Sequence, residues 1–318
     1  RPLARSGRGL FAVSARSLPA LARLCERHAV HLARAGTAEP LADLCASTLL
    51  GRRRFEHVLC LYPDSHAELI AQLHASAARL RQAPAPAAPA AIDTLALRLV
   101  AGAALPTATL AGWHDEPRFA AALAAARDAL SAAQAGGPAG EGAPASLDAA
   151  WFCVLHALSH CMAAFGVEPD RIDYRGRLWL AAAPIHQAGS LDEAARRFLA
   201  ADPAPAPKRL GGIALRPADQ CEGDEGEGGF LMLRDASGRA TRHLDAAAGL
   251  DDEAWRRAFG ALWEGGRRVD WLAGFAGSGY RRVALPAYPF EHRDCSRPAR
   301  LPAGERSLEQ LLEDLQAE

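Results

Sequence analysis

Short apolar runs alternate with amphipathic stretches over residues 10–81 of the chain. The runs LFAVS (10–14) and HVLCLY (57–62) predict two β-strands. Apolar residues recur at helical spacing between and after these runs. They predict three helices, which begin after Ser17, at Pro40 and at Asp64 or Ser65, the third ending near Arg81. The pattern therefore predicts a compact β-α-α-β-α unit.

The middle of the chain follows a Pro/Ala-rich spacer at 82–91, which is expected to be extended. Beyond it the apolar pattern predicts helices over 116–130, 147–165, 191–200 after a Ser190 cap, and 251–265. The strongly apolar composition of 147–165 predicts a buried helix. Strands over 211–216 and 229–233 flank an acidic loop at 222–227, which predicts a hairpin with a solvated tip. A short charged helix is expected over 307–317.

Composition narrows the classes of function. The 318 residues carry a formal net charge of −1, so there is no electrostatic case for nucleic acid or a membrane surface as partner. No uninterrupted apolar run approaches the roughly 20 residues that span a bilayer. Seven scattered cysteines without a CxxC pair favour a reducing, cytoplasmic location. The chain begins with Arg1, and we expect it to be a segment of a longer polypeptide.

One stretch, 166–194, has the pattern of a strand, a turn and a helix: GVEPDRIDYRGRLWLAAAPIHQAGSLDEA. In many acyl-handling enzymes such a turn exposes a nucleophile close to a helix N-terminus. The strand here is expected to end near Ile172. The turn that follows consists of Tyr174, Arg175, Gly176 and Arg177.

The outer blocks of the chain resemble parts of modular polyketide synthases. LFAVSARSLPALARL (10–24) and LADLCASTLLGRRRFEH (41–57) are similar to the adaptor that joins ketosynthase to acyltransferase. VDW (269–271) followed by RRVALPAYPFEH (281–292) resembles the linker after the acyltransferase, which in that family packs back on the adaptor and the ketosynthase. Its apolar, proline-stiffened strip needs a covering surface, and the resemblance implies packing by Val283, Leu285, Tyr288 and Phe290.

The centre resembles an acyltransferase domain that has lost its chemical residues. EPRFAAAL (116–123) matches a family helix, and 166–194 stays in register with GVxPDxxxGHSxGExxAAxxxGxxSLEDA. The nucleophilic serine then falls on Gly176, the oxyanion Gln on Ala101, and the carboxylate-binding arginine on Ala201. No FHS-like histidine motif is present in the sequence, and 200–255 is too short for a complete ferredoxin-like subdomain.

These losses have a chemical consequence. Acyl transfer from a thioester needs a nucleophile, a base and donors for the oxyanion. Glycine cannot attack, and removal of a nucleophile of this kind costs on the order of 10⁶ in rate. We therefore expect no catalytic residue at this turn, and we expect no metal in the segment.

The resemblance implies an α/β fold in three parts: a small α+β adaptor (1–91), a truncated acyltransferase-like α/β core without a complete ferredoxin-like subdomain (92–268), and a linker that packs back on the adaptor and ketosynthase (269–318). It implies a non-catalytic docking segment that positions a ketosynthase and an acyl carrier protein. The expected partners are the ketosynthase of the same polypeptide, through which a homodimer forms, the carrier protein, and a discrete trans-acting malonyl acyltransferase. No cofactor is expected in the segment, because phosphopantetheine belongs to the carrier protein.

A second hypothesis is enzymatic and uses residues of one predicted helix. His156 and His160 share a helical face, and Cys153 lies one turn before His156, with Cys161 beside His160. A Cys/His pair predicts altered acyl transfer or thioester hydrolysis. A zinc site is a related alternative, with His186 or Asp173 as a further ligand. The competing interpretation is a buried helix that carries small polarizable side chains.

A third hypothesis concerns the two arginines at the turn. Arg175 and Arg177 at a helix N-terminus predict an anion site for a phosphopantetheine or CoA phosphate. The segment would then be a carrier-protein or pantetheine binding module. The competing interpretation is solvated surface charge.

Overall fold

A computed structural model describes residues 9–35, 39–82, 92–101, 104–105, 117–135, 146–200, 205–220, 229–235, 240–245, 252–276 and 279–290. The chain divides into two compact units, Arg1–Tyr288 and Pro289–Glu318, and every helix and strand named below belongs to the first. The fold is mixed α/β, as the sequence predicts. Ala201, the acidic loop 222–227 and the segment 307–317 lie outside the described residues.

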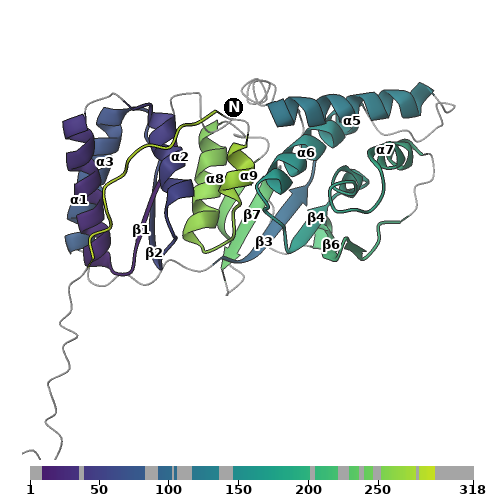
Figure 1. Cartoon of the computed structure of the whole chain (residues 1–318). Helices are drawn as coiled ribbons and strands as arrows, with labels where there is room; N and C mark the ends of the chain where they lie inside the picture. The colour runs from purple at the N-terminus through teal and green to yellow at the C-terminus, as the bar shows by residue number, and fades with distance from the viewer. Residues whose placement is uncertain are drawn as a thin grey trace, which may run out of the picture. The chain divides into compact units, whose positions relative to one another are not determined.

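The N-terminal part, residues 9–82, is called the adaptor below. Its elements are β1 (Phe11–Ala15), α1 (Leu18–Ala35), α2 (Leu41–Gly51), β2 (His57–Leu61) and α3 (His66–Gln82). The predicted β-α-α-β-α order is confirmed. Strands β1 and β2 lie next to each other (Figure 1) and pair antiparallel, with Phe11 opposite Leu61. Their apolar side chains pack on the helices.

Side-chain caps begin two adaptor helices where the sequence places them. The Ser17 hydroxyl accepts a hydrogen bond from the Ala20 amide at 3.2 Å. Ser65, rather than Asp64, caps α3, because its hydroxyl accepts from the Glu68 amide at 3.1 Å. The Glu68 carboxylate accepts in turn from the Asp64 amide at 2.8 Å, which completes a reciprocal capping box.

A six-stranded sheet forms the second part of this unit. Its strands are β3 (Ile92–Leu99), β4 (Arg171–Tyr174), β5 (Arg209–Leu210), β6 (Ile213–Pro217), β7 (Gly229–Asp235) and β8 (Ala240–Asp245). The order is β5-β6-β4-β3-β7-β8, and β3, β4 and β6 are parallel. The hairpin predicted from strands at 211–216 and 229–233 is therefore wrong: β6 pairs with β4, whereas β7 pairs with β3 and β8. Sequence neighbours do not pair here because two other strands lie between them.

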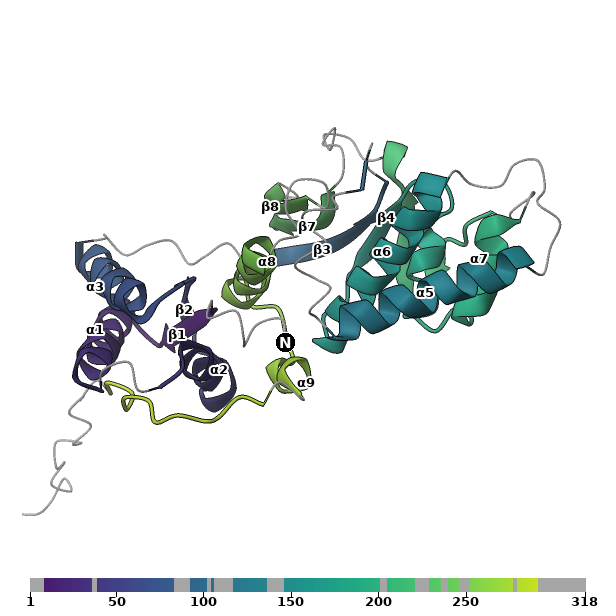
Figure 2. The same ribbon diagram turned by 90° about the horizontal axis from the view of Figure 1, so that it is seen from above.

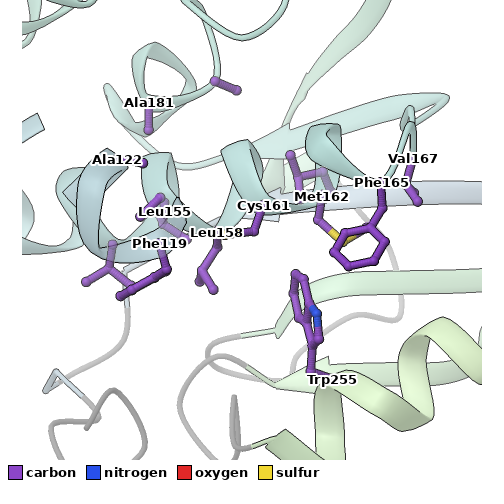
Figure 3. Close-up of a cluster of buried hydrophobic side chains, with 14 of the residues drawn as sticks. Phe119, Ala122, Leu155, Leu158, Cys161, Met162, Phe165, Val167, Ala181 and Trp255 are labelled. Carbon is purple, nitrogen blue, oxygen red and sulfur yellow. The ribbon is translucent and has the colours of Figure 1, made fainter. Parts of the chain in front are cut away.

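Three helices, α5 (Pro117–Ala135), α6 (Ser146–Ala164) and α7 (Leu191–Leu199), cover one face of β3 and β4 (Figures 1 and 2). Helix α6 is buried, as its composition predicts, and its apolar side chains meet Phe119 of α5 and Trp255 of α8 (Asp252–Glu264) in one core (Figure 3). Among the helices of the described residues, α6 alone is long and apolar enough to cross a membrane, but 61% of that stretch is buried inside the protein. A buried core helix passes the same test, so this is weak evidence for a span.

Helix α8 protects the open edge of β2. The Glu264 carboxylate accepts a hydrogen bond from the Cys60 amide at 2.9 Å, so this outward-facing donor of an edge strand is satisfied. The Arg54 guanidinium donates to the carbonyls of Trp263 and Glu264 at the end of α8. A short helix, α9 (Trp271–Phe275), follows, and the Asp270 side chain caps it. The apolar pattern of the sequence did not predict β3, β8 or α9.

Candidate functional site

The predicted turn, residues 174–177, is called the elbow below. It follows β4, and its neighbour is the end of β3, since Leu99 pairs with Tyr174 and the Leu99 carbonyl accepts from the Arg175 amide at 3.1 Å. Gly176 has φ +58°, and a Cβ built on it would meet no atom within 4 Å. Left-handed backbone of this kind favours glycine and is costly for other residues. The elbow therefore makes a sharp, open turn, and the residue at its centre has no side chain.

The segment after the elbow differs from a nucleophile elbow. A 3₁₀-helix, η1 (Leu178–Ala181), and further turns follow it, and the next α-helix begins only at Leu191. Pro184 explains part of this difference, because it lacks an N–H and disfavours helical backbone at the residue before it. The residues of η1 are all buried and hold the segment against the core. The predicted α-helix directly after the turn is therefore absent from this described stretch.

The two elbow arginines have different surroundings. Arg177 donates through Nη1 to the carbonyls of Phe198 at 2.8 Å and Ala200 at 2.6 Å, which closes the C-terminus of α7. Arg175 is exposed. The structure thus gives Arg177 a role in the protein itself, and it does not present the two guanidinium groups as a matched pair for a phosphate.

The position of the expected oxyanion residue also lacks a donor side chain. Ala101 follows β3 and is half-buried against the apolar core, and its strand ends beside the elbow. The fold therefore brings together the two segments that the resemblance pairs, one with Gly176 and one with Ala101. Neither side chain can attack a thioester or stabilise an oxyanion.

The cysteines and histidines of α6 occupy unlike environments. His156 is buried, and its Nδ1 donates to the Ala181 carbonyl at 2.8 Å; burial lowers the pKa of His156, an effect this hydrogen bond partly offsets. His160 is exposed, and its ring centre lies 6.4 Å from that of His156. The Cys153 and Cys161 side chains are buried, and burial raises the pKa of Cys153 to about 11.

These environments bear on both chemical hypotheses for α6. A thiol with a raised pKa is protonated near neutral pH, and the thiolate is the nucleophile. A histidine whose pKa is lowered and whose Nδ1 is already bonded to a carbonyl is poorly placed to hold that thiolate. The described residues contain no group of three or more His, Cys, Asp or Glu side chains that could hold a metal ion. Burial also lowers the pKa of His186, which the zinc alternative invoked.

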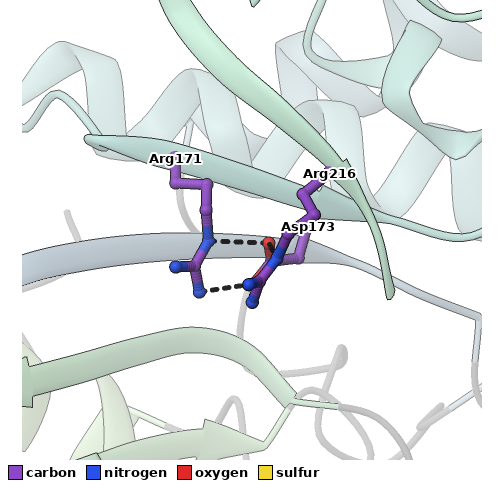
Figure 4. A network of polar contacts seen from close by, with 3 residues as sticks. All are labelled: Arg171, Asp173 and Arg216. Atoms are coloured by element: carbon purple, nitrogen blue, oxygen red, sulfur yellow. Dashed lines mark hydrogen bonds and ion pairs between the residues drawn. The ribbon is translucent and has the colours of Figure 1, made fainter. Parts of the chain in front are cut away.

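A buried charge network on β4 was not predicted from the sequence. Asp173 is fully buried, and Arg171 binds it with two hydrogen bonds, at 2.7 Å and 2.9 Å (Figure 4). Arg216 reaches the same carboxylate from β6 at 3.4 Å, because the two residues are partners in the parallel register. The paired charges keep the carboxylate from being buried alone. Arg171 and Asp173 lie two residues apart on β4, whereas only the strand register brings Arg216 to them.

The C-terminal strip, residues 279–288, is called the strap below, and it lies on the adaptor. The Arg281 amide donates to the Asp43 carboxylate and the Val283 amide to the Ser47 hydroxyl, both at 2.9 Å. The strap side chains that pack against the adaptor core are Val283, Leu285 and Tyr288. The remaining residue of the predicted packing set, Phe290, is 75% exposed.

Adaptor side chains hold the rest of the strap through its carbonyls. Arg52 donates through Nη2 to the Pro286 carbonyl at 2.6 Å and to the Leu285 carbonyl at 3.2 Å. The Tyr288 hydroxyl accepts from the Arg16 amide at 3.0 Å, and its ring lies 5.2 Å from that of Phe55. Pro286 has no N–H to donate to a regular ladder, and adaptor side chains bond the strap backbone in place of a partner strand.

Comparison with known proteins gives one family match and several structural likenesses. Residues 9–73, within the adaptor, match the model of the family described as CurL-like, PKS C-terminal, where PKS denotes polyketide synthase. This agrees with the resemblance that the adaptor sequence carries. No curated protein matches the chain.

Three solved acyltransferase structures are similar to part of the chain. The acyltransferase domain of ZmaA is 19% identical over 62% of this chain, with a TM-score of 0.47. The acyltransferase domain from module 8 of the salinomycin polyketide synthase is 24% identical over 61% (TM-score 0.46), and that of SpnD in complex with 2-(pent-4-yn-1-yl)malonyl is 21% identical over 61% (TM-score 0.43). The chain spans about half the length of these structures, 48% of each.

Proposed function

We propose that this chain is a non-catalytic docking and spacing segment of a polyketide synthase module, in which the adaptor and strap form the working surface. The observation that carries the proposal is the elbow: a sharp turn beside the end of β3 whose central residue is Gly176 at φ +58°. The turn retains a shape suited to an exposed nucleophile and has none. The family match of residues 9–73 supports the module context.

The proposed role of the adaptor and strap is mechanical. The strap is joined to α2 by buried Asp43 and Ser47 and to the adaptor core by three apolar side chains. Such a fixed strip can hold a neighbouring ketosynthase and a carrier protein at a constant distance. These two domains of the same cytoplasmic assembly, and a malonyl acyltransferase acting in trans, are the partners we propose. Phosphopantetheine would be carried by the carrier protein.

The first test is acylation of the full chain. The purified protein is incubated with malonyl-CoA and with acetyl-CoA, and its intact mass and the free CoA released are measured. We expect no adduct and no thioester hydrolysis above the rate without protein. An adduct that disappears in Cys153→Ser or Cys161→Ser would overturn the proposal in favour of the enzymatic hypothesis.

The second test addresses docking. The ketosynthase of the same module is mixed with the full chain, and co-elution on a sizing column is measured. We expect co-elution of the native chain and its loss in a variant in which Asp43 and Ser47 are both alanine, whereas the exposed-site variant Asp128→Ala co-elutes as the native chain does. Equal co-elution of the Asp43/Ser47 variant and the native chain would show that the strap does not build the docking surface.

A further inference from the structure

A hollow of about 470 Å³ lies between α5 and α6, away from the elbow and the strap. This volume is within the range of pockets that bind small molecules. Its walls are mainly aliphatic and come from both helices and from the segment after β3: Leu105, Leu123, Leu130 and Val154. An apolar hollow of this size is suited to a medium-length hydrocarbon chain, because burying such a chain removes apolar surface from water.

One edge of the hollow is polar. Arg127, Ser131 and Gln134 recur at helical spacing on α5, so they share one face, and all three are exposed while lining the hollow. The Arg127 side chain is exposed where it lines the hollow, and its charge acts on the Cys153 thiol. A guanidinium beside two neutral hydrogen-bonding groups favours a planar anion. A carboxylate fits best, because its two oxygens can accept two parallel N–H donors of the guanidinium.

Cys153 defines the chemistry of the opposite wall. Its buried thiol lines the hollow, and burial raises its pKa to about 11. The thiol therefore remains protonated near neutral pH and contributes as a small apolar group. His156, one turn along α6, is bonded to Ala181 of η1 and does not line the hollow. The arrangement favours reversible binding over covalent capture.

From this juxtaposition of an aliphatic hollow and the Arg127 edge, we propose that the α5–α6 hollow binds a medium-chain carboxylate, with the alkyl chain between the helices and the carboxylate at Arg127. This proposal stands apart from the proposed docking function. A dispensable strap would overturn the docking role and leave the hollow unaffected, whereas an acyl adduct on Cys153 would count against both proposals.

The test is a titration of the full chain with octanoate, followed by calorimetry or by NMR shifts of α5 and α6. We expect saturable one-site binding. Octanamide, which keeps the chain length and loses the charge, should bind more weakly by about two- to fivefold, as expected for an exposed ion pair. Arg127→Gln should lower the affinity for octanoate by the same factor. The matched exposed variant Arg175→Gln should bind octanoate as the native chain does.

Two further variants distinguish binding in the hollow from nonspecific hydrophobic binding elsewhere on the surface. Ser131→Trp places a large ring at the mouth and should reduce octanoate affinity at least tenfold, whereas Ala132→Trp adds the same ring at an adjacent exposed position that does not line the hollow. Both positions are exposed, so folding should be preserved, and thermal unfolding checks this. Octanoate should also slow alkylation of Cys153 by N-ethylmaleimide, with no effect on Cys25.

Several results would overturn the proposal. These are no saturable octanoate binding up to millimolar concentration, equal affinity in Ser131→Trp and Ala132→Trp, or unchanged Cys153 alkylation at saturation. If Arg175→Gln lowered the octanoate affinity and Arg127→Gln did not, the carboxylate would bind at the elbow instead.

Discussion

Buried side chains of α2 bind the strap, whereas no neighbouring atom lies close to the central residue of the elbow, Gly176. Arg281 and Val283 each donate a backbone hydrogen bond to a buried side chain of α2. At the elbow, a Cβ on Gly176 would have no atom within 4 Å, and Arg177 serves the end of α7. The strap is held by side-chain contacts with the adaptor, whereas Gly176 of the elbow is defined only by its backbone conformation. The difference shows how a fold can keep the frame of a reactive turn without residues that react.

The largest expected effect comes from the aromatic cluster that leads into the strap. Trp271 is buried among Phe165, Phe259, Trp263 and Phe275, with ring centres 5.7 to 6.2 Å from its own. We expect Trp271→Ala to lower the free energy of unfolding by about 3–5 kcal/mol, because it removes a large side chain and leaves a cavity. Chemical denaturation measures this. Leu272→Ala is the control, since that side chain is 68% exposed and should change stability little.

Acid should destabilise the adaptor through His28. Burial, with a smaller contribution from Arg52, lowers the pKa of His28 to about 3, well below its ordinary value of 6.5. Between these values the unfolded chain binds the extra proton, so stability is full above about pH 6.5 and is lost as the pH falls toward 3. The loss is at most about 1.4 kcal/mol per pH unit.

The pH prediction is tested with His28→Leu, by following the free energy of unfolding from pH 7 to pH 4.5. The variant should show a flatter decline than the native chain, and the exposed-site control His74→Leu should decline as the native chain does. An equally steep decline in His28→Leu would show that the acid sensitivity arises elsewhere. The pKa of His156 is also lowered by burial, but its hydrogen bond to Ala181 opposes this effect, so His28 is the better histidine for this test.

The anchoring of the strap gives an intermediate effect. Asp43→Ala leaves the Arg281 amide without its acceptor, and we expect a loss of about 1–3 kcal/mol together with faster tryptic cleavage after Arg281 or Arg282. Asp43→Asn keeps an oxygen at the same position and should restore most of the loss. Cleavage at the native rate in Asp43→Ala would mean that the strap is held by its apolar side chains alone.

The smallest effect is expected at the elbow. Gly176→Ala has room for its methyl group but must adopt φ +58°, so we expect a loss of about 1–2 kcal/mol. Thermal or chemical denaturation measures it. A loss above about 3 kcal/mol would contradict the open space around this residue and place the elbow among the tightly packed regions.

Local patterns predicted the local features of this fold. The Ser17, Ser65 and Ser190 caps follow from residue type and position, and each is made in the structure. The burial of α6 follows from its apolar composition. Of the candidate site, the sequence placed Gly176 at the centre of a turn, and the positive φ supports that register.

Features that depend on strand pairing were missed. The hairpin expected over 211–233 failed because β4 and β3 lie between β6 and β7, which no neighbouring residues reveal. Arg216 meets Asp173 only through the parallel register of β4 and β6. The 3₁₀-helix after the elbow was missed as well, although Pro184 gave a local signal against a continuous α-helix.

The most direct test of the central claim, an elbow frame without acyl chemistry, is intact-mass measurement of the native chain and of Gly176→Ser after incubation with malonyl-CoA. The account predicts that neither protein gains a malonyl group, because the native elbow has a glycine at its centre and a restored hydroxyl lacks a donor side chain at Ala101 and a paired base. A malonyl adduct on the native chain would contradict the claim outright. An adduct on Gly176→Ser that is absent from Gly176→Ala would show that the rest of the catalytic site is still in place.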